Sequence, residues 1–427
     1  MALVVKNGRL INPATGEDKI CDIRIDGTKI TAIGTDVDMQ DADILDATGL
    51  VVTPGLIDMH VHLRQPGQSA KETIESGTKA AAAGGFTRVA TMPNTKPVID
   101  SAIIVDGLKY KIADEGVVKV DIIGSLSKGL EGKELSSMGG MAKAGVVAFS
   151  DDGRYVQNCD FMRKAMEYAG MFGKIVIDHC EDADLIEGGH MHEGVVSHEL
   201  GLKGRPAVAE DIAVARDILL AEATGTAVHI AHISTKNAVQ MVRQAKAKGL
   251  KVTAEATPQH MILTDEALRS YDPRFKVNPP LRSEEHRKAV VEGLVDGTID
   301  AIVTDHAPHT IEEKDCEFSL APSGFVGLET SLGTVLTYLY HTGTVDLMTL
   351  IRTMTSSPAA LLGVDAGNVA VGKTADLTIM DLNKKWTVDS DKFYSKGKST
   401  PFEDMILKGK AVATIVDGKI VMKDGEV

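Results

Sequence analysis

The feature that most constrains this chain is a repeated alternation between short apolar runs and helix-patterned stretches through its middle. Such alternation is typical of βα units, whose strands lie parallel in one sheet. Eight runs favour an α/β fold of the (β/α)8 TIM type, with an open, doubly wound sheet as the alternative. The expected strands cover residues 56–63, 87–93, 120–125, 146–150, 174–179, 227–233, 251–257 and 301–305.

The two ends of the chain share a different texture, with short β-runs and glycine-containing turns. Asn7-Gly8 and Asp26-Gly27 are typical hairpin turns near the start, and Asp417-Gly418 is another near the end. We therefore expect a small β-sandwich-like domain built from residues 1–52 and 365–427. The barrel would then occupy residues 53–364 between them.

Composition narrows the functional classes. Lys and Arg total 46 against 60 for Asp and Glu, a net charge of −14, which argues against nucleic acid as a partner. The chain shows neither a signal-peptide pattern nor an apolar run of about 18 residues, so we expect no membrane contact and a cytoplasmic location. Its four cysteines form no CxxC pair, which predicts reduced thiols.

Ligand-type residues appear first in the strand predicted at residues 56–63. Because strand residues two apart share a face, Asp58, His60 and His62 should project together. Two imidazoles on one buried face can converge on a metal ion, and the alternative is a pair of hydrogen-bonded core histidines. The opposite face would carry Ile57, Met59, Val61 and Leu63.

Similar residues follow most of the other predicted strands. In a barrel the active site lies where the strands end, so these side chains should meet at one rim. Even four histidines and two carboxylates from this rim are more than one tetrahedral zinc ion needs, and such a set suits two metals with a bridging carboxylate. The residues at the rim are His60, His62, Arg64, Asn94, Asp151, Asp152, His179, His232, Asp305, His306 and His309.

Alternation along a strand separates some neighbours. Asp305 and His306 cannot both face the barrel axis, and we favour Asp305 because hydrolytic metal sites need a base beside the water. His229 should point away from His232, toward the helices or toward a partner behind the ligands. The same reasoning does not choose between Asp151 and Asp152.

Several motifs resemble a known family. D-M-H-V-H-L-R-Q-P-G at 58–67 and T-D-H-A-P-H-T-I-E-E-K at 304–314 look like the paired signatures of dihydroorotases, in the amidohydrolase superfamily. The first signature also fits hydantoinases and allantoinases. A-P-H-x4-K and the K-V-N-P-P-L-R stretch at 276–282 point more specifically to the bacterial class I dihydroorotases. The resemblance covers nearly the whole chain, including F-S-D-D-G at 149–153 and S-G-F-V-G-L-E-T at 323–330.

This resemblance implies two Zn2+ ions in each chain. Many relatives bridge their metals with a carboxylated lysine on the fourth strand, but the fourth strand predicted here contains no lysine. The chain therefore resembles the aspartate-bridged variant. The implied ligands are His60, His62 and Asp305 for one ion, His179 and His232 for the other, and Asp152 as the bridge.

The implied reaction is the reversible cyclisation of N-carbamoyl-L-aspartate to L-dihydroorotate plus water, in de novo pyrimidine (UMP) biosynthesis. In the hydrolytic direction a zinc-bridged hydroxide would attack the ring, because metal coordination lowers the pKa of water from about 15.7 to near 7. Asp305 would serve as general base and then general acid. Arg64 would grip the substrate carboxylate with help from Asn94 and His309, and Asn278 would contact the carbamoyl edge.

Other interpretations stay open. Asn94 and Asn278 each adjoin a proline and are as readily turn residues as ligands. Residues 310–322 form either a lid over the substrate or a long βα loop. For the whole chain the alternatives are a hydantoinase, dihydropyrimidinase or allantoinase, or an inactive structural partner of aspartate carbamoyltransferase. A homodimer and a complex with that enzyme are both compatible with the sequence.

Overall fold

The computed structural model describes residues 2–427 and contains a barrel of parallel strands. The eight-stranded sheet runs in the order β15-β14-β13-β10-β9-β8-β7-β6. A parallel bridge from Val61 to His306 joins its two edges, which confirms the predicted (β/α)8 fold. The strands are β6 (Leu56–Val61), β7 (Phe86–Thr91), β8 (Lys119–Gly124), β9 (Ala148–Ser150), β10 (Ile175–Asp178), β13 (Val228–Ile230), β14 (Val252–Ala256) and β15 (Ala301–Ile302).

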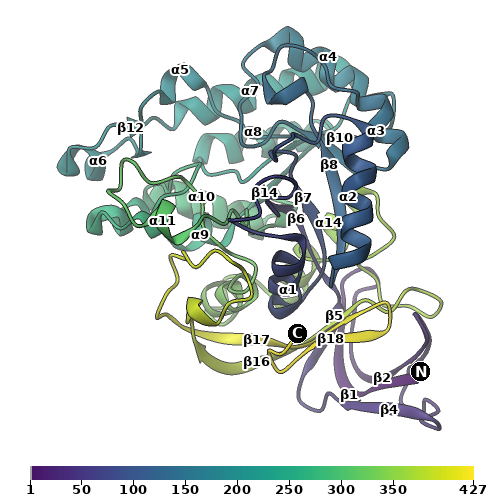
Figure 1. The fold of residues 1–427 in the computed structure, drawn as a ribbon. Helices are drawn as coiled ribbons and strands as arrows, with labels where there is room; N and C mark the ends of the chain where they lie inside the picture. Colours follow the sequence, from purple (N-terminus) through teal and green to yellow (C-terminus); the bar gives the residue numbers. More distant parts are fainter. Residues whose placement is uncertain (1) are drawn as a thin grey trace.

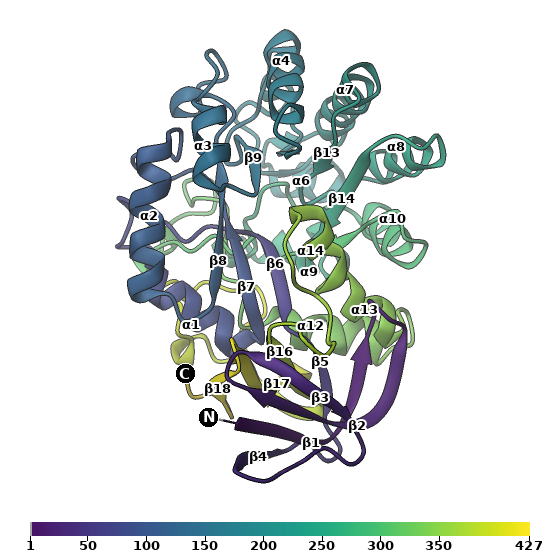
Figure 2. The ribbon, with the colours of Figure 1, turned by 90° about the vertical axis from the view of Figure 1, so that its right-hand side faces the viewer.

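Helices surround these strands (Figure 2). Thr73 caps the first helix, which begins at Ile74, and Thr235 caps the helix that begins at Lys236. Each threonine side chain accepts a main-chain N–H, which explains where its helix begins. Gly85 ends the first with a left-handed φ of 92°. The surrounding helices are α1 (Ile74–Gly84), α2 (Ala102–Glu115), α3 (Met138–Ala144), α4 (Cys159–Gly170), α7 (Val208–Thr224), α8 (Lys236–Ala247) and α10 (Glu284–Val295).

Shorter elements fill the connections. Between β10 and α7 lie α5 (Ala183–Ile186), α6 (Val195–Leu200) and a ribbon of β11 (Met191–His192) with β12 (Gly204–Arg205). After β14 comes α9 (Pro258–Ile262), and after β15 come α11 (Ile311–Lys314), α12 (Ser331–Val335), α13 (Leu347–Thr353) and α14 (Ser356–Leu362). None of the helices within residues 2–427 combines the length and apolar character needed to cross a membrane.

The barrel interior is apolar toward the amino ends of its strands. Inward-facing residues such as Ile123 and Ile177 form one cluster with Ala359 and Leu362 of α14. Figure 2 shows α14 lying across this end of the barrel. The helix therefore acts as a plug, and it leaves the carboxyl ends of the strands as the open mouth.

Strand β6 departs from the strict alternation that the sequence predicted. Ile57 and Met59 pack in the interior cluster, whereas Val61 and Leu63 pack with the surrounding helices. The register of β6 against β7 shifts in the middle of the strand, which marks a bulge. The predicted common face of these four residues is therefore wrong, and the bulge is the physical reason.

A second sheet of eight strands combines both ends of the chain, with early and late strands side by side (Figure 1). It has a hydrophobic core of its own, which is consistent with a sandwich-like region built from the termini. We propose that the chain divides into two domains near residues 52 and 365. The strands are β1 (Ala2–Asn12), β2 (Glu17–Asp26), β3 (Lys29–Gly34), β4 (Ala42–Asp46), β5 (Val51–Pro54), β16 (Leu377–Thr387), β17 (Ile406–Val416) and β18 (Lys419–Lys423).

Asn7-Gly8 is not the hairpin turn that the sequence predicted. Strand β1 runs through this pair, with a register shift against β2 at the same point. Asn7 adopts a left-handed φ of 57°, so the pair forms a bulge within a continuous strand. Asp26-Gly27, by contrast, does lie at the turn between β2 and β3.

Candidate metal centre

The carboxylate of Asp152 lies at the centre of four imidazoles at the carboxyl ends of the barrel strands. Its Oδ2 atom is 3.5 Å from both His60 Nε2 and His62 Nε2. Its Oδ1 atom is 3.3 Å from His179 Nδ1 and 3.5 Å from His232 Nε2. One carboxylate thus faces two separate histidine pairs, one through each oxygen.

The donor atoms around this carboxylate fit a divalent cation. Asp305 Oδ1 lies 3.0 Å from His62 Nε2 and 3.6 Å from His60 Nε2. Ligands about 2.1 Å from a tetrahedral ion lie about 3.4 Å from one another, which is close to these spacings. Among residues 2–427, His60 Nε2 and Asp152 Oδ1 are buried without a hydrogen-bond partner, an arrangement that is costly unless a ligand satisfies them.

The electrostatics of this rim also favour a cation. Burial opposes charge on His60, yet the carboxylates of Asp152 and Glu255 raise its pKa well above the ordinary value. Burial likewise opposes charge on Asp305, yet hydrogen bonding to His62 and the nearby His60 lower its pKa. The buried carboxylates therefore create a negative potential that stabilises positive charge between them.

The structure decides two orientations that alternation had left open. Asp151 turns away from the histidines, because its Oδ1 accepts the N–H groups of Leu126 at 2.8 Å and Ser127 at 3.0 Å. Asp152 is the residue of the pair that faces the cluster. His229 contacts a partner behind the ligands rather than the outer helices, since its Nε2 lies 3.1 Å from Glu255 Oε2.

Two side chains fix which ring nitrogen of His60 and of His62 faces Asp152. Glu255 Oε1 lies 2.5 Å from His60 Nδ1, and Asn94 Oδ1 accepts from His62 Nδ1 at 2.8 Å. With Nδ1 engaged, the Nε2 atom of each ring faces the carboxylates of Asp152 and Asp305 and can bind a metal placed between them. Sequence reasoning missed Glu255, although a carboxylate between apolar neighbours in mid-strand was an available signal.

Three residues of the rim have left-handed backbone conformations. The φ angles are 63° at Arg64, 28° at His232 and 49° at Asp305. Non-glycine residues rarely adopt such angles, and those that do cluster at functional sites. Ala231 faces the barrel interior, so an extended chain would send the next side chain outward. The left-handed turn brings the ring of His232 to Asp152 instead.

A cavity of about 220 Å³ opens beside this cluster, and Arg64 lines it. Burial lowers the pKa of the Arg64 guanidinium to about 10, so the group is still charged at neutral pH. Its Nε donates to Pro308 O at 3.1 Å, and no carboxylate of residues 2–427 lies within ion-pairing distance. A buried guanidinium with free donors beside a cavity is suited to binding an anion.

The other predicted substrate contacts line the same cavity. Asn278 Nδ2 donates to Tyr155 OH at 2.7 Å, and Arg205 donates to the Oδ1 atom of Asn278. His309 Nε2 donates to Ser323 O at 2.9 Å, and burial lowers the pKa of His309 to about 3. The predicted contacts are thus gathered at one place, and the hydroxyl of Tyr155, a residue that sequence reasoning missed, holds Asn278 there.

A third group of ligand-type side chains lies behind β10. It consists of Asp178, Cys180 and Asp217. Arg216 donates to Asp178 at 2.8 Å and to Asp217 at 2.7 Å. The guanidinium already supplies positive charge to both carboxylates, so this group is less suited to a cation than the cluster around Asp152.

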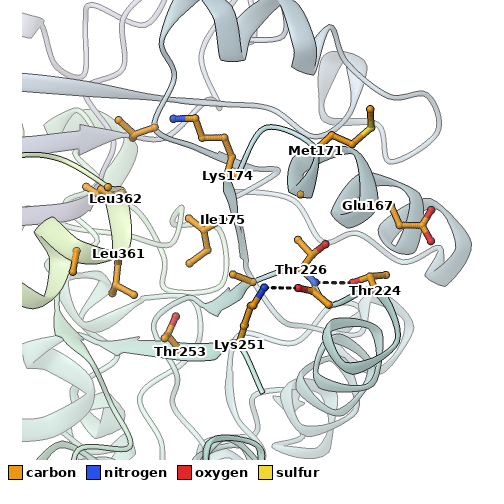
Figure 3. A pocket seen from close by; sticks show the side chains of 17 residues that line it. Glu167, Met171, Lys174, Ile175, Thr224, Thr226, Lys251, Thr253, Leu361 and Leu362 are labelled. Carbon is orange, nitrogen blue, oxygen red and sulfur yellow. Dashed lines mark hydrogen bonds between the residues drawn. The ribbon is translucent and has the colours of Figure 1, made fainter. Parts of the chain in front are cut away.

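A larger cavity, of about 850 Å³, lies at the opposite ends of the strands. Lys174 and Lys251 border it beside β10 and β14, and Leu362 enters from α14 (Figure 3). The Lys251 ammonium donates to the main-chain carbonyl of Gly225 at 3.0 Å. None of the groups of metal-ligating side chains found in residues 2–427 borders this cavity. Size alone would favour this cavity as the substrate site, but the side chains favour the smaller cavity beside Asp152.

Comparison with known proteins agrees with this geometry. Residues 49–238 match the family described as Dihydro-orotase-like, and residues 323–422 match the Amidohydrolase family. A dihydroorotase from Pelotomaculum thermopropionicum is 53% identical over 424 residues, which cover 99% of each chain. The chain belongs to the dihydroorotase family. Another dihydroorotase, from Geobacter metallireducens, is 51% identical over 99% of this chain and 100% of its own length.

Solved structures extend the likeness beyond dihydroorotases. An L-hydantoinase (dihydropyrimidinase) from Arthrobacter aurescens is 28% identical and superposes with a TM-score of 0.91, covering 100% of this chain and 97% of its own. The dihydroorotase family thus shares its fold with an enzyme whose name refers to other cyclic substrates, hydantoin and dihydropyrimidine. The choice of substrate must therefore depend on the side chains that line the cavity.

Proposed function

We propose that this member of the dihydroorotase family interconverts N-carbamoyl-L-aspartate and L-dihydroorotate plus water, a step of pyrimidine biosynthesis. The observation that carries the proposal is the buried, unpaired guanidinium of Arg64 beside the metal-binding cluster. Dihydroorotate has a ring carboxylate that hydantoin and dihydrouracil lack. A site for those neutral rings would gain nothing from a buried cation, because burying charge without a partner is costly.

We propose that the cluster holds two zinc ions. His60, His62 and Asp305 would hold one ion, while His179 and His232 would hold the other. Asp152 would bridge the two, because each of its oxygens faces one histidine pair. When bound, such ions lower the pKa of a water molecule and polarise the carbonyl oxygen of the substrate.

Asp305 is the residue we assign to proton transfer. It borders the cavity and is held by His62 through one oxygen. In hydrolysis it accepts a proton from water as the new C–O bond forms. It then donates this proton to the ring nitrogen as the C–N bond breaks, which frees the terminal NH2 of the carbamoyl group of N-carbamoyl-L-aspartate. In cyclisation the same transfers run backward, and water leaves.

The remaining polar residues hold the substrate. Arg64 would bind the carboxylate through two parallel hydrogen bonds. Asn94 already uses its Oδ1 to orient His62, and its amide nitrogen is left for the same carboxylate. Neutral His309 would add a contact from the loop after β15. Asn278 would meet the carbamoyl edge after exchanging one of its present partners.

Competing cyclic amides test the proposed function. The protein is incubated with Zn2+, its bound metal is measured, and it is assayed with dihydroorotate and, in parallel, with dihydrouracil and hydantoin. We expect turnover of dihydroorotate to exceed that of the two neutral rings by about 100-fold or more, the value of one buried charge-assisted contact. Faster turnover of dihydrouracil would contradict the proposal and favour the hydantoinase interpretation. Absence of activity together with absence of bound metal would favour an inactive structural partner.

The proposed function also bears on where the protein works and on its oligomeric state. An enzyme that makes a nucleotide precursor is suited to the cytoplasm. For its assembly we propose either a homodimer or a complex with aspartate carbamoyltransferase. Light scattering of the chain alone, and then with that enzyme, distinguishes a monomer, a homodimer and a mixed complex.

A further inference from the structure

Two buried lysines near the cavity take no part in the reaction as described. Lys276 begins the K-V-N-P-P-L-R motif, and Lys314 ends the A-P-H-x4-K motif. They are 6% and 7% exposed, and neither forms an ion pair with a carboxylate of residues 2–427. Burying an ammonium group is costly unless its hydrogens find acceptors. The acceptors that these lysines use are therefore informative.

Both lysines donate to main-chain carbonyls of one segment, residues 315–324. This segment contains no helix or strand. Among its carbonyls only that of Glu317 accepts main-chain N–H groups of residues 2–427, from Leu320 and Ala321, so the others depend on side chains or water for partners. Charge-assisted hydrogen bonds are stronger than neutral ones and fix the chain that accepts them. The acceptors are Phe318 O at 2.9 Å and Ser319 O at 2.8 Å for Lys276, and Pro322 O and Gly324 O at 3.0 Å each for Lys314.

The end of this segment forms one wall of the cavity. Ser323 and Gly324 line it, and Ser323 O accepts from His309 Nε2. Gly324 has a φ of 116°, and a Cβ at this position would lie 2.8 Å from the Cβ of Ala307. The backbone therefore approaches the neighbouring loop as closely as glycine allows. A small displacement of the segment would reshape the wall beside His309.

The lysines act as cations at neutral pH. Burial lowers the pKa of Lys276 and of Lys314 to about 8, which leaves both mostly protonated. The lysines thus combine two effects, four hydrogen bonds to the segment and positive charge near a cavity suited to an anion. Besides each other, the charged and titratable groups nearest to them are Arg205, Asp272, Glu317 and the thiol of Cys316.

We propose that Lys276 and Lys314 are positioning residues, which clamp residues 315–324 against the cavity and so form the wall beside the substrate carboxylate. This inference rests on the proposed function, because it takes the cavity as the dihydroorotate site. Residues 310–322 would then be a loop held in place as a fixed wall of the cavity, and not a lid that opens freely over the substrate. Neither lysine borders the cavity, so their loss should weaken substrate binding more than it slows the chemical step.

The test replaces each lysine by methionine, which keeps the length and removes the donors. In Lys314→Met and Lys276→Met we expect the KM for dihydroorotate to rise by about tenfold or more, with kcat within about threefold of wild type. Amide hydrogen exchange of peptides that cover residues 315–324 should become faster, and metal content should not change. Because the two variants remove different contacts, one suffices if the other does not fold.

Lys246→Met is the matched control. Lys246 also donates to two main-chain carbonyls, Gly297 O at 3.0 Å and Thr298 O at 2.8 Å, but it lies in α8 and pairs with Asp300. This variant should lose stability without a change in KM. Unchanged exchange of residues 315–324 in both clamp variants would overturn the proposal. Faster exchange with an unchanged KM would overturn it as well.

Failure of this inference is distinguishable from failure of the proposed function. If wild-type protein does not turn over dihydroorotate, the proposed function fails, whereas the exchange experiment still reports whether the lysines hold the segment. If wild type is active and the clamp variants match it in KM, the inference alone fails.

Discussion

The two ends of the barrel differ in what they are built from. The carboxyl ends of the strands carry four histidines and buried carboxylates around a cavity of about 220 Å³, with three left-handed residues among them. The amino ends carry a larger cavity of about 850 Å³ and a helix that plugs the interior with Ala359 and Leu362. The smaller cavity therefore lies beside the candidate metal ligands, and the larger one lies beside the apolar cluster that closes the barrel.

This difference separates stability from function in a single fold. Packing at the plugged end removes apolar surface from water and needs no unusual backbone. The open end instead accumulates buried polar atoms without partners and strained residues, features that cost stability and persist where a ligand repays them. Substitutions at the open end should thus change metal content and kinetics, and substitutions at the plugged end should change stability.

The largest effect is expected at His60. Replacing it by alanine removes a nitrogen that faces Asp152 and Asp305, so His60→Ala should lose activity and bound metal together. Metal analysis by mass spectrometry beside the dihydroorotate assay checks this. A fully active variant with a normal metal content would remove His60 from the centre and weaken the contrast between the two ends.

Asp305 should show the next effect. Asp305→Asn keeps the shape of the side chain and loses the basic oxygen, so turnover should fall by about 10²–10⁴-fold, the usual size of an acid–base contribution. Substrate binding should persist, measured by calorimetry with dihydroorotate. A kcat near that of wild type would exclude Asp305 as the proton carrier.

Arg64 should have a smaller and more selective effect. Arg64→Met should lower kcat/KM for dihydroorotate by a factor that corresponds to a loss of about 2–4 kcal/mol of transition-state stabilisation, because the substrate carboxylate loses a buried charged partner. Metal content and melting temperature serve as controls and should match wild type. An unchanged kcat/KM would show that the carboxylate binds elsewhere.

The plugged end should show the opposite pattern. Leu362→Ala removes a buried side chain of α14, so the free energy of unfolding should fall by about 2–5 kcal/mol. Its kcat/KM should stay within about twofold of wild type. Denaturant unfolding beside the assay measures both quantities. A large kinetic effect without loss of stability would mean that the two ends are coupled.

Lys251 provides the smallest expected change. It borders the larger cavity and binds one main-chain carbonyl near the surface. Lys251→Met should change the free energy of unfolding by about 0.5 kcal/mol or less and leave kcat unchanged. A substantial loss of activity would give the larger cavity a function that its side chains do not suggest.

The sequence predicted the barrel because eight strand–helix units repeat a simple pattern of apolar residues. It also predicted which residues meet at the mouth, since the carboxyl ends of parallel strands lie at one rim. Alternation failed wherever the backbone left the extended conformation. The bulge in β6 moved Val61 and Leu63 away from Ile57, and the left-handed residue His232 turned inward after Ala231.

Partners that lie far apart in the chain were beyond sequence reasoning. Glu255 supports His60 from 195 residues away, and Tyr155 holds Asn278 from 123 residues away. Neither pairing follows from spacing, because it depends on which strands become neighbours in the closed barrel. The choice between Asp151 and Asp152 likewise needed the loop around Ser127, which draws Asp151 away from the histidines.

The proposed metal centre places Asp152 between two metal ions at the mouth of the barrel. Crystals of the zinc-loaded protein, measured with X-rays at the zinc absorption edge, test it most directly through the anomalous signal. We expect two peaks, one between Asp152, His60 and His62 and one between Asp152, His179 and His232. A zinc-loaded crystal with no peak beside Asp152, or with its only peaks elsewhere in the barrel, would contradict the account.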